Sequence, residues 1–262
     1  VPDGCKVIGE SAFAYSKLTE IVIPEGVTEI SDSAFYRCSE LAKISLPTSL
    51  KSIGKNAFGY SGLKYINILE GVTSIGESAF YESEIYVIEL PRTLNFIGDR
   101  AFISRNLKDV VYSGTEAEWG NISVDYSVNP YLKNATKHYA VVASGKCGDS
   151  AYWYLDQNYV LTIAGSGCMY DYEPDNQPWL NLRDQMKGVI VGGSVTKIGR
   201  SAFYFFPDME TITIGKSVTE IGNAAFSKSK ITSITIPSTV KKVDIYCCLL
   251  YTSPSPRDYA AS

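Results

Sequence analysis

The hexapeptide Ile-Gly-Glu-Ser-Ala-Phe (IGESAF) occupies Ile8–Phe13 and returns unchanged at Ile75–Phe80. Looser versions of it stand at positions 30–35, 53–58, 97–102, 198–203 and 221–226. In the first group the starting positions 8, 30, 53, 75 and 97 lie 22 or 23 residues apart. A unit of this size that recurs at a fixed spacing predicts a solenoid, in which each unit forms one coil.

Each unit carries further apolar positions at constant distances from the hexapeptide. Two of them flank a polar residue, as Ile66 and Ile68 do, and this alternation predicts a half-buried strand. We expect a second, shorter strand at Val-Thr-x-Ile and a tight helical turn at Gly-x-x-Ala-Phe. Each large side chain gains only about 1.5–3 kcal/mol on full burial, so one unit cannot offset its own ordering entropy. The units are therefore expected to fold only as a stack, with parallel strands ~4.8 Å apart.

The composition argues against several functional classes. The chain has 262 residues, with 24 basic and 28 acidic side chains and a net charge of -4. The basic residues form no stripe, so we expect no nucleic-acid binding. The apolar runs are far shorter than the ~20 residues of a membrane span. The hydrolase, metalloprotease, phosphate-loop and dinucleotide motifs are absent, so we expect neither catalysis nor a cofactor.

The repeat resembles the BspA-type leucine-rich repeats, from Val1 to about Val243. The resemblance implies a β-rich, right-handed superhelix with short parallel strands and short helical turns. It also implies display outside a bacterial cell, and binding or adhesion to a protein or glycan ligand, including ligands on a host surface or matrix. It implies no catalytic residues.

Breaks in the period divide the sequence into segments. Thr115 suits the N-cap of a short helix whose Trp119 covers the last coil. Later, a polar turn at Asp156-Gln157-Asn158 predicts a β-hairpin, and Pro178 predicts a helix start with Asn176 as its cap. The expected segments are a first array at 1–114, a cap at 115–140, a hairpin and short helix at 141–186, and a second array at 187–247. We expect the first parallel ladder to end near Gly114 and a separate one to begin near Val189.

Both ends of the sequence look incomplete. Val1 is not Met and opens within a repeat, so we expect the chain to be a fragment. Residues 248–258 read CLLYTSPSPRD, which resembles a translated sequencing-library adapter. We therefore expect 248–262 to be an artefactual tail that does not form a coil.

The cysteines indicate packing more than chemistry. Cys5 occupies an apolar slot and is expected to act as a small core residue. Cys38 stands in a turn where the resembled family places a buried cysteine. Cys147 and Cys168 flank the hairpin, so a disulfide between them stays open.

Two further groups could in principle form a site. His138 is the only histidine, and we favour a strand position in the cap over a catalytic or metal-binding role. Asp171, Glu173 and Asp175 alternate like the start of a calcium loop, but Asn176 and Leu182 replace the glycine and glutamate that such a loop needs. A solvated turn is the favoured interpretation, and no metal is expected.

The candidate binding surface follows from strand alternation. Side chains between the buried positions of each long strand must point outward. In leucine-rich repeats such rows lie on the concave face. The two rows are Glu20, Lys43, Tyr65, Val87, Asp109 and Val22, Ser45, Asn67, Glu89, Val111. We expect Tyr65, Val87 and Val111 to form an exposed apolar strip with a charged rim, which is typical of interface hot spots. The alternative site is the set of turns carrying Tyr15, Tyr36, Tyr60 and Tyr81.

Three functions remain open from the sequence. Binding or adhesion at the cell surface is favoured, because a solenoid offers a continuous surface. A purely structural spacer is the second. In the third, the repeats are the targeting module of a larger secreted enzyme whose catalytic domain lies outside this sequence.

Overall fold

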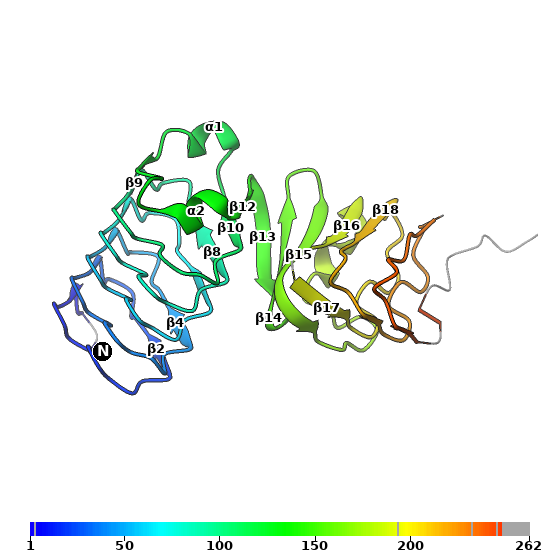
Figure 1. The fold of residues 1–262 in the computed structure, drawn as a ribbon, viewed down its shortest axis with the longest axis horizontal. Coiled ribbons are helices and arrows are strands. Elements are labelled where there is room, and N and C mark those ends of the chain that lie inside the picture. The colour runs from blue at the N-terminus through cyan, green and yellow to red at the C-terminus, as the bar shows by residue number, and fades with distance from the viewer. Residues whose placement is uncertain (3, 193, 232, 245, 248–262) are drawn as a thin grey trace, which may run out of the picture. The chain divides into compact units, whose positions relative to one another are not determined.

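The computed structural model describes residues 1–2, 4–192, 194–231, 233–244 and 246–247 (Figure 1). The predicted adapter-like tail, 248–262, lies outside the described residues. The chain divides into two compact units, Val1–Val142 and Ala143–Ser262. Each unit has a hydrophobic core of its own.

Each coil of the first unit contributes one short strand and one longer strand. The short strands are β1 (Val7–Ile8), β3 (Glu29–Ile30), β5 (Ser52–Ile53), β7 (Ser74–Ile75), β9 (Phe96–Ile97) and β11 (Ser123–Val124). The longer strands are β2 (Glu20–Val22), β4 (Lys43–Ser45), β6 (Tyr65–Asn67), β8 (Val87–Leu90), β10 (Asp109–Tyr112) and β12 (Thr136–His138).

Strands of successive coils pair in parallel, as the repeat predicts. The short strands form one sheet in the order β1-β3-β5-β7-β9-β11. The longer strands form a two-stranded sheet, β2-β4, and a four-stranded sheet, β12-β10-β8-β6. The predicted β-solenoid is confirmed (Figure 1).

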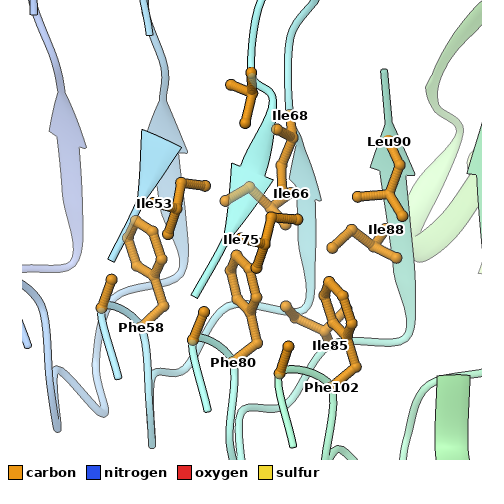
Figure 2. Close-up of a cluster of buried hydrophobic side chains, with 14 of the residues drawn as sticks. Ile53, Phe58, Ile66, Ile68, Ile75, Phe80, Ile85, Ile88, Leu90 and Phe102 are labelled. Atoms are coloured by element: carbon orange, nitrogen blue, oxygen red, sulfur yellow. The ribbon is translucent and has the colours of Figure 1, made fainter. Parts of the chain in front are cut away.

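The repeated apolar positions form the core of the first unit. Ile66 and Ile88, aligned on neighbouring strands, are 1% and 0% exposed. The phenylalanine of the hexapeptide stacks on its counterpart in the next coil. The rings of Phe35 and Phe58 have centroids 5.3 Å apart and planes 1° apart. Figure 2 shows how Phe80 and Phe102 continue the column from Phe58. Because the phenylalanine stands at the same position of every repeat, each coil contributes one ring to the same column of the core.

The turn after each short strand is not helical, so the predicted helical turns are wrong. Ser11 and Tyr15 have φ of 55° and 62°, in the left-handed region, and the next coils repeat this alternation. A left-handed residue stops a right-handed helix. Alternate turn amides bond to the next coil, as Phe13 N–H does to the Ala34 carbonyl at 2.8 Å, while the amides between them bond within the turn, as Ala14 N–H does to the Ser11 carbonyl at 3.1 Å.

A cap ends the first unit. Helix α1 (Glu116–Trp119) begins at Thr115, which forms a capping box with Glu118, and Trp119 is buried against the core as predicted. Strands β11 and β12 pair with β9 and β10, so both ladders run beyond the predicted limit at Gly114. The broken period hid this extension, because neither cap strand carries the repeat's apolar pair.

Polar side chains replace the missing next coil. Helix α2 (Pro130–Asn134) follows Asn129, whose Oδ1 accepts from the Phe102 amide at 3.3 Å. Lys137 stands opposite Val110 in the register, in the slot that other coils fill with an aliphatic residue. Its ammonium donates to the carbonyls of Leu132, Lys133 and Ala135 at 2.6–2.8 Å, which satisfies groups at the end of α2. The cap thus closes the core and supplies partners to its last backbone groups.

The second unit begins with a hairpin. Its strands are β13 (Val141–Lys146), β14 (Gly148–Asp156), β15 (Val160–Met169), β16 (Gly188–Val191), β17 (Ser194–Ile198), β18 (Thr211–Ile214), β19 (Glu220–Ile221) and β20 (Lys242–Val243). Strands β14 and β15 are antiparallel around the predicted turn, with Trp153 opposite Ile163, so the hairpin is confirmed. Strand β15 also pairs in parallel with β16 and β17, so this ladder starts at Val160 and not near Val189.

The short helix expected at Pro178 starts two residues later and is a 3-10 helix. A 3-10 helix, η1, spans Leu180–Gln185 and follows Trp179. It has no side-chain cap, so the predicted Asn176 cap is wrong. The Trp179 ring stacks on Phe203, with centroids 5.6 Å apart, and Phe203 stacks on Phe226. Trp179 therefore takes the place of the hexapeptide phenylalanine in the coil that the hairpin replaces.

Candidate functional site

The candidate binding surface is the outward side of β2, β4, β6, β8 and β10, which we call the strand face. The register aligns the two predicted rows as expected. Glu20 stands opposite Lys43, and Tyr65 opposite Val87 and then Asp109. The second row aligns Val22 with Ser45, and Asn67 with Glu89 and Val111. Accessibility nevertheless differs sharply between the two ends of the face.

The end formed by β8 and β10 is closed. Val87 and Val111 are 0% and 3% exposed, although neither belongs to the core of the unit. The predicted exposed strip of Tyr65, Val87 and Val111 is therefore wrong. The register supplies one reason. Val87 lies between Tyr65 and Asp109, and Val111 lies between Glu89 and His138, so each valine has a longer side chain on both sides.

Two hydrogen-bonded pairs cross this closed end. The Tyr65 hydroxyl donates to Glu89 Oε1 at 2.5 Å, and His138 Nε2 lies 2.9 Å from Asp109 Oδ1. The other oxygen of Asp109, Oδ2, is buried and has no hydrogen-bond partner among the described residues. His138 lies in a cap strand, as predicted. The His138–Asp109 pair joins residues 29 apart in the sequence, because β12 extends the ladder beyond β10.

The end formed by β2 and β4 is open. Val22 is 71% exposed, and Glu20, Lys43 and Ser45 are exposed around it. These residues and Ile21 line a depression of about 260 Å³. Asn67, on β6, is also exposed. An exposed aliphatic side chain with charged neighbours is the arrangement that the sequence predicted for the centre of the face, here found at its first two strands.

The charged side chains of the open end are not engaged in ion pairs within the described part of the chain. Glu20 and Lys43 stand opposite each other, yet neither forms an ion pair within the part of the chain that the structure describes. Two other pairs of exposed charges in this unit are formed: Lys55 Nζ lies 2.9 Å from Glu77, and Arg92 lies 2.6 Å from Glu118. A partner with complementary charges could therefore bind here without breaking existing pairs.

The other candidate groups have structural roles. Cys38 is fully buried, and its thiol donates to the Phe13 carbonyl at 3.1 Å, while Cys5 is only partly buried against the core. Cys147 and Cys168 are free thiols. Burial raises the pKa of the Cys147 thiol, so this group stays protonated at physiological pH.

The acidic alternation near the hairpin is a network of ion pairs. Asp171 accepts from Lys197 Nζ at 3.1 Å, Glu173 pairs with Arg200, and Asp175 pairs with Arg183. Hydrogen bonds, first from the Arg200 amide and then from Lys197, hold the pKa of Asp171 below its usual value. No cluster of metal-ligating side chains occurs among the described residues.

None of the helices in the described ranges is long and apolar enough to cross a membrane.

Comparison with solved structures gives low-identity matches. The alignment with the pneumococcal vaccine antigen PcpA covers 91% of this chain and 63% of that one, at 15% identity and a TM-score of 0.32. The alignment with a leucine-rich cell-surface protein of Faecalibacterium prausnitzii covers 91% of this chain and 73% of that one, at 21% identity and a TM-score of 0.32. The alignment with the T. pallidum leucine-rich repeat protein covers 81% of this chain and 77% of that one, at 20% identity and a TM-score of 0.35. The chain thus spans less than two thirds of the pneumococcal antigen.

No curated protein matches the sequence significantly. The family model for the BspA-type leucine-rich repeat region matches residues 6–128 and 182–253 in six copies. These ranges take in both sets of hexapeptides and leave out the end of the cap and the hairpin, where the period is broken. The chain therefore belongs to the BspA-type leucine-rich repeat family.

Proposed function

We propose that this protein is a non-catalytic, protein-binding module of a bacterial cell surface, and that it holds its ligand on the open end of the strand face. Membership of a leucine-rich repeat family supports a repeat-based surface or binding module. Adhesion outside the cell is the use we assign to that binding.

One observation carries the proposal. Val22 is 71% exposed in a depression whose charged side chains, Glu20 and Lys43, have no ion-pair partners within the described chain. Folding gains little from a valine left so open, because its apolar area stays in water. A ligand that covers Val22 and pairs with the two charges would recover that energy and add directional contacts.

The proposal places the binding energy on β2 and β4 and not on β8 and β10. Val87 and Val111 are already buried, so a ligand can gain no further apolar burial from them. Tyr65 and Glu89 are hydrogen-bonded to each other, which leaves them less able to change partners. We assign these four residues to stabilising the face.

The test is an adhesion assay with the full chain on beads and a layer of cultured epithelial cells. Beads with the native chain should adhere, and protease treatment of the cell surface should abolish adhesion, because the ligand is a protein. The double variant Val22→Asp with Lys43→Glu should reduce adhesion at least tenfold, which corresponds to a total loss of about 1.4 kcal/mol of binding free energy.

The matched control is Val142→Asp, since Val142 is also an exposed strand valine, at 61%. It should leave adhesion unchanged. Absence of adhesion by the native chain contradicts the adhesion role, and undiminished adhesion of the double variant contradicts the site. Adhesion that survives protease contradicts a protein ligand.

A further inference from the structure

A row of tyrosines follows the turns between the short and the longer strands of the first unit. Tyr15, Tyr36, Tyr60 and Tyr81 come from four successive coils. Their ring centroids lie 5.8, 5.7 and 5.6 Å apart, and the rings meet edge to face. We call these residues, with Arg37, the tyrosine row. It lies outside the strand face, on another part of each coil.

The row exposes two rings with a cation between them. Tyr15 and Tyr60 are 67% and 36% exposed, while Tyr36 and Tyr81 are partly buried. Tyr15, Arg37 and Tyr60 occupy the same slot of three consecutive coils, two residues after the hexapeptide phenylalanine. The Arg37 guanidinium lies 5.1 Å from the ring centroid of Tyr60 and 5.6 Å from that of Tyr36.

The backbone conformation at this slot does not favour large side chains. Tyr15, Arg37 and Tyr60 have φ of 62°, 58° and 57°. The left-handed region costs a non-glycine residue roughly 1–2 kcal/mol, and glycine or asparagine would fit it more cheaply. Large side chains that are kept in strained, exposed positions point to a functional use.

The neighbouring coil is shaped to fit the row. Gly59 precedes Tyr60 and has no side chain, and a Cβ there would lie 3.2 Å from Cδ2 of Tyr36. Glycine at this position lets the Tyr36 ring lie against the backbone of the next coil. Arg37 is exposed and forms no ion pair with any residue in the described part of the chain. The cation is therefore available to an anionic ligand.

We propose that the tyrosine row binds an acidic polysaccharide, with sugar rings on Tyr15 and Tyr60 and the carboxylate of the intervening sugar on Arg37. The apolar face of a pyranose stacks on a phenol ring, and a guanidinium pairs with a carboxylate in a bidentate manner. Glu82 occupies the same slot in the fourth coil and would repel a further carboxylate, which limits the anionic site to three coils.

Spacing favours a polysaccharide over an acidic peptide. Two coil steps of ~4.8 Å separate Tyr15 from Tyr60 by about 10 Å. A pyranose with its linkage is about as long as one coil step, so every second sugar meets an exposed ring. In an extended peptide, side chains on one face repeat every ~6.6 Å, twice the rise per residue, which does not match the rings.

The test measures binding of galacturonic acid oligosaccharides to the full chain by calorimetry. Arg37→Gln and Tyr60→Ala should each weaken binding at least tenfold. The same oligosaccharide with its carboxylates methyl-esterified should bind the native chain at least tenfold more weakly and should be insensitive to Arg37→Gln. The matched control is Tyr159→Ala, because Tyr159 is 40% exposed with φ of 60°, close to the values for Tyr60.

Four results would overturn the proposal: no binding of the acidic oligosaccharide, equal binding of its ester, an equal loss with Tyr159→Ala, or equal binding of polyglutamate, which would identify an acidic peptide site. Melting temperatures show whether Tyr60→Ala unfolds the array, and Arg37→Gln keeps the test decisive in that case. The Val22→Asp, Lys43→Glu variant should retain oligosaccharide binding, which separates this site from the strand face.

Discussion

Truncating one ring of the phenylalanine column tests how strongly neighbouring coils depend on each other. Phe58 is fully buried and stacks on two rings, Phe35 at 5.3 Å and Phe80 at 5.3 Å. Phe13, at the start of the column, is only partly buried and stacks on Phe35 alone, at 5.1 Å. The same substitution at the two sites therefore differs in burial and in the number of coils that lose a contact.

The expected costs follow from these contacts. A buried Phe→Ala change costs about 3–5 kcal/mol, and two lost aromatic pairs, each worth ~0.5–1.5 kcal/mol beyond burial, put Phe58→Ala at the upper end. Phe13→Ala removes one pair and a smaller buried area, so about 1–2 kcal/mol is expected. Phe58→Leu, which refills most of the cavity, should fall between these values.

Native-state hydrogen exchange read by mass spectrometry separates the two units, because each gives its own peptides. With tenfold for each 1.4 kcal/mol, Phe58→Ala should speed exchange of the slowest first-unit amides by about three orders of magnitude. Phe13→Ala should speed it by about tenfold. Peptides around Phe226, in the second unit, should not change. Equal acceleration by the two variants would refute the argument that interior coils are coupled on both sides.

Three other predictions use inside, outside and strained positions. Ile66→Ala should lower the free energy of unfolding by about 2–5 kcal/mol, whereas exposed Thr73→Ala should cost well under ~1 kcal/mol; equal shifts in urea midpoints would contradict the inward assignment. Iodoacetamide at pH 8 should alkylate exposed Cys168 and spare Cys147, whose pKa is raised by burial; alkylation of both cysteines, read by peptide mass spectrometry, would contradict the burial of Cys147. Gly165 has φ of 84°, and a Cβ there would lie 2.2 Å from a backbone oxygen of β14. Gly165→Ala should therefore lower the melting temperature of the second unit, seen by calorimetry, and an unchanged transition would contradict that backbone path.

The alignment of the repeats predicts those features of the fold that recur in every coil, and few others. The buried positions of the strands, the phenylalanine column and the parallel pairing all follow from aligning the hexapeptide, because every coil meets the same neighbours. The accessibility of the strand face is not periodic. Val87 on β8 and Val22 on β2 both occupy outward strand positions, yet they are 0% and 71% exposed. What differs is the size and reach of the neighbouring side chains, such as Tyr65 across to Glu89.

The turn conformation could not be predicted from composition. The hexapeptide carries serine or another non-glycine residue at its fourth position, and such residues suggest a right-handed turn. The left-handed φ of Ser11 and Ser33 is imposed by the next coil, since their amides donate to the Asp32 and Lys55 carbonyls at 3.0 and 2.7 Å. The cap contacts of Lys137 and His138 were also hidden, because Thr-Lys-His lacks the apolar pair that marks a repeat strand. The one available signal was the strand-like alternation around the only histidine.

The ladders of the first array finish, and those of the second array begin, with different kinds of strand. This difference indicates the role of the hairpin. The first array closes with two separate cap strands, β11 on the short ladder and β12 on the longer one. In the second, one ten-residue strand serves both ladders: Val160–Ile163 of β15 pairs with β16, and Ser166–Cys168 pairs with β17. Gly165 and Gly167, with φ of 84° and 78°, let the strand turn from one ladder to the other. With Trp179 completing the ring column, the hairpin occupies the place of a first coil, and we therefore infer that the predicted linking segment acts as the N-terminal cap of the second array.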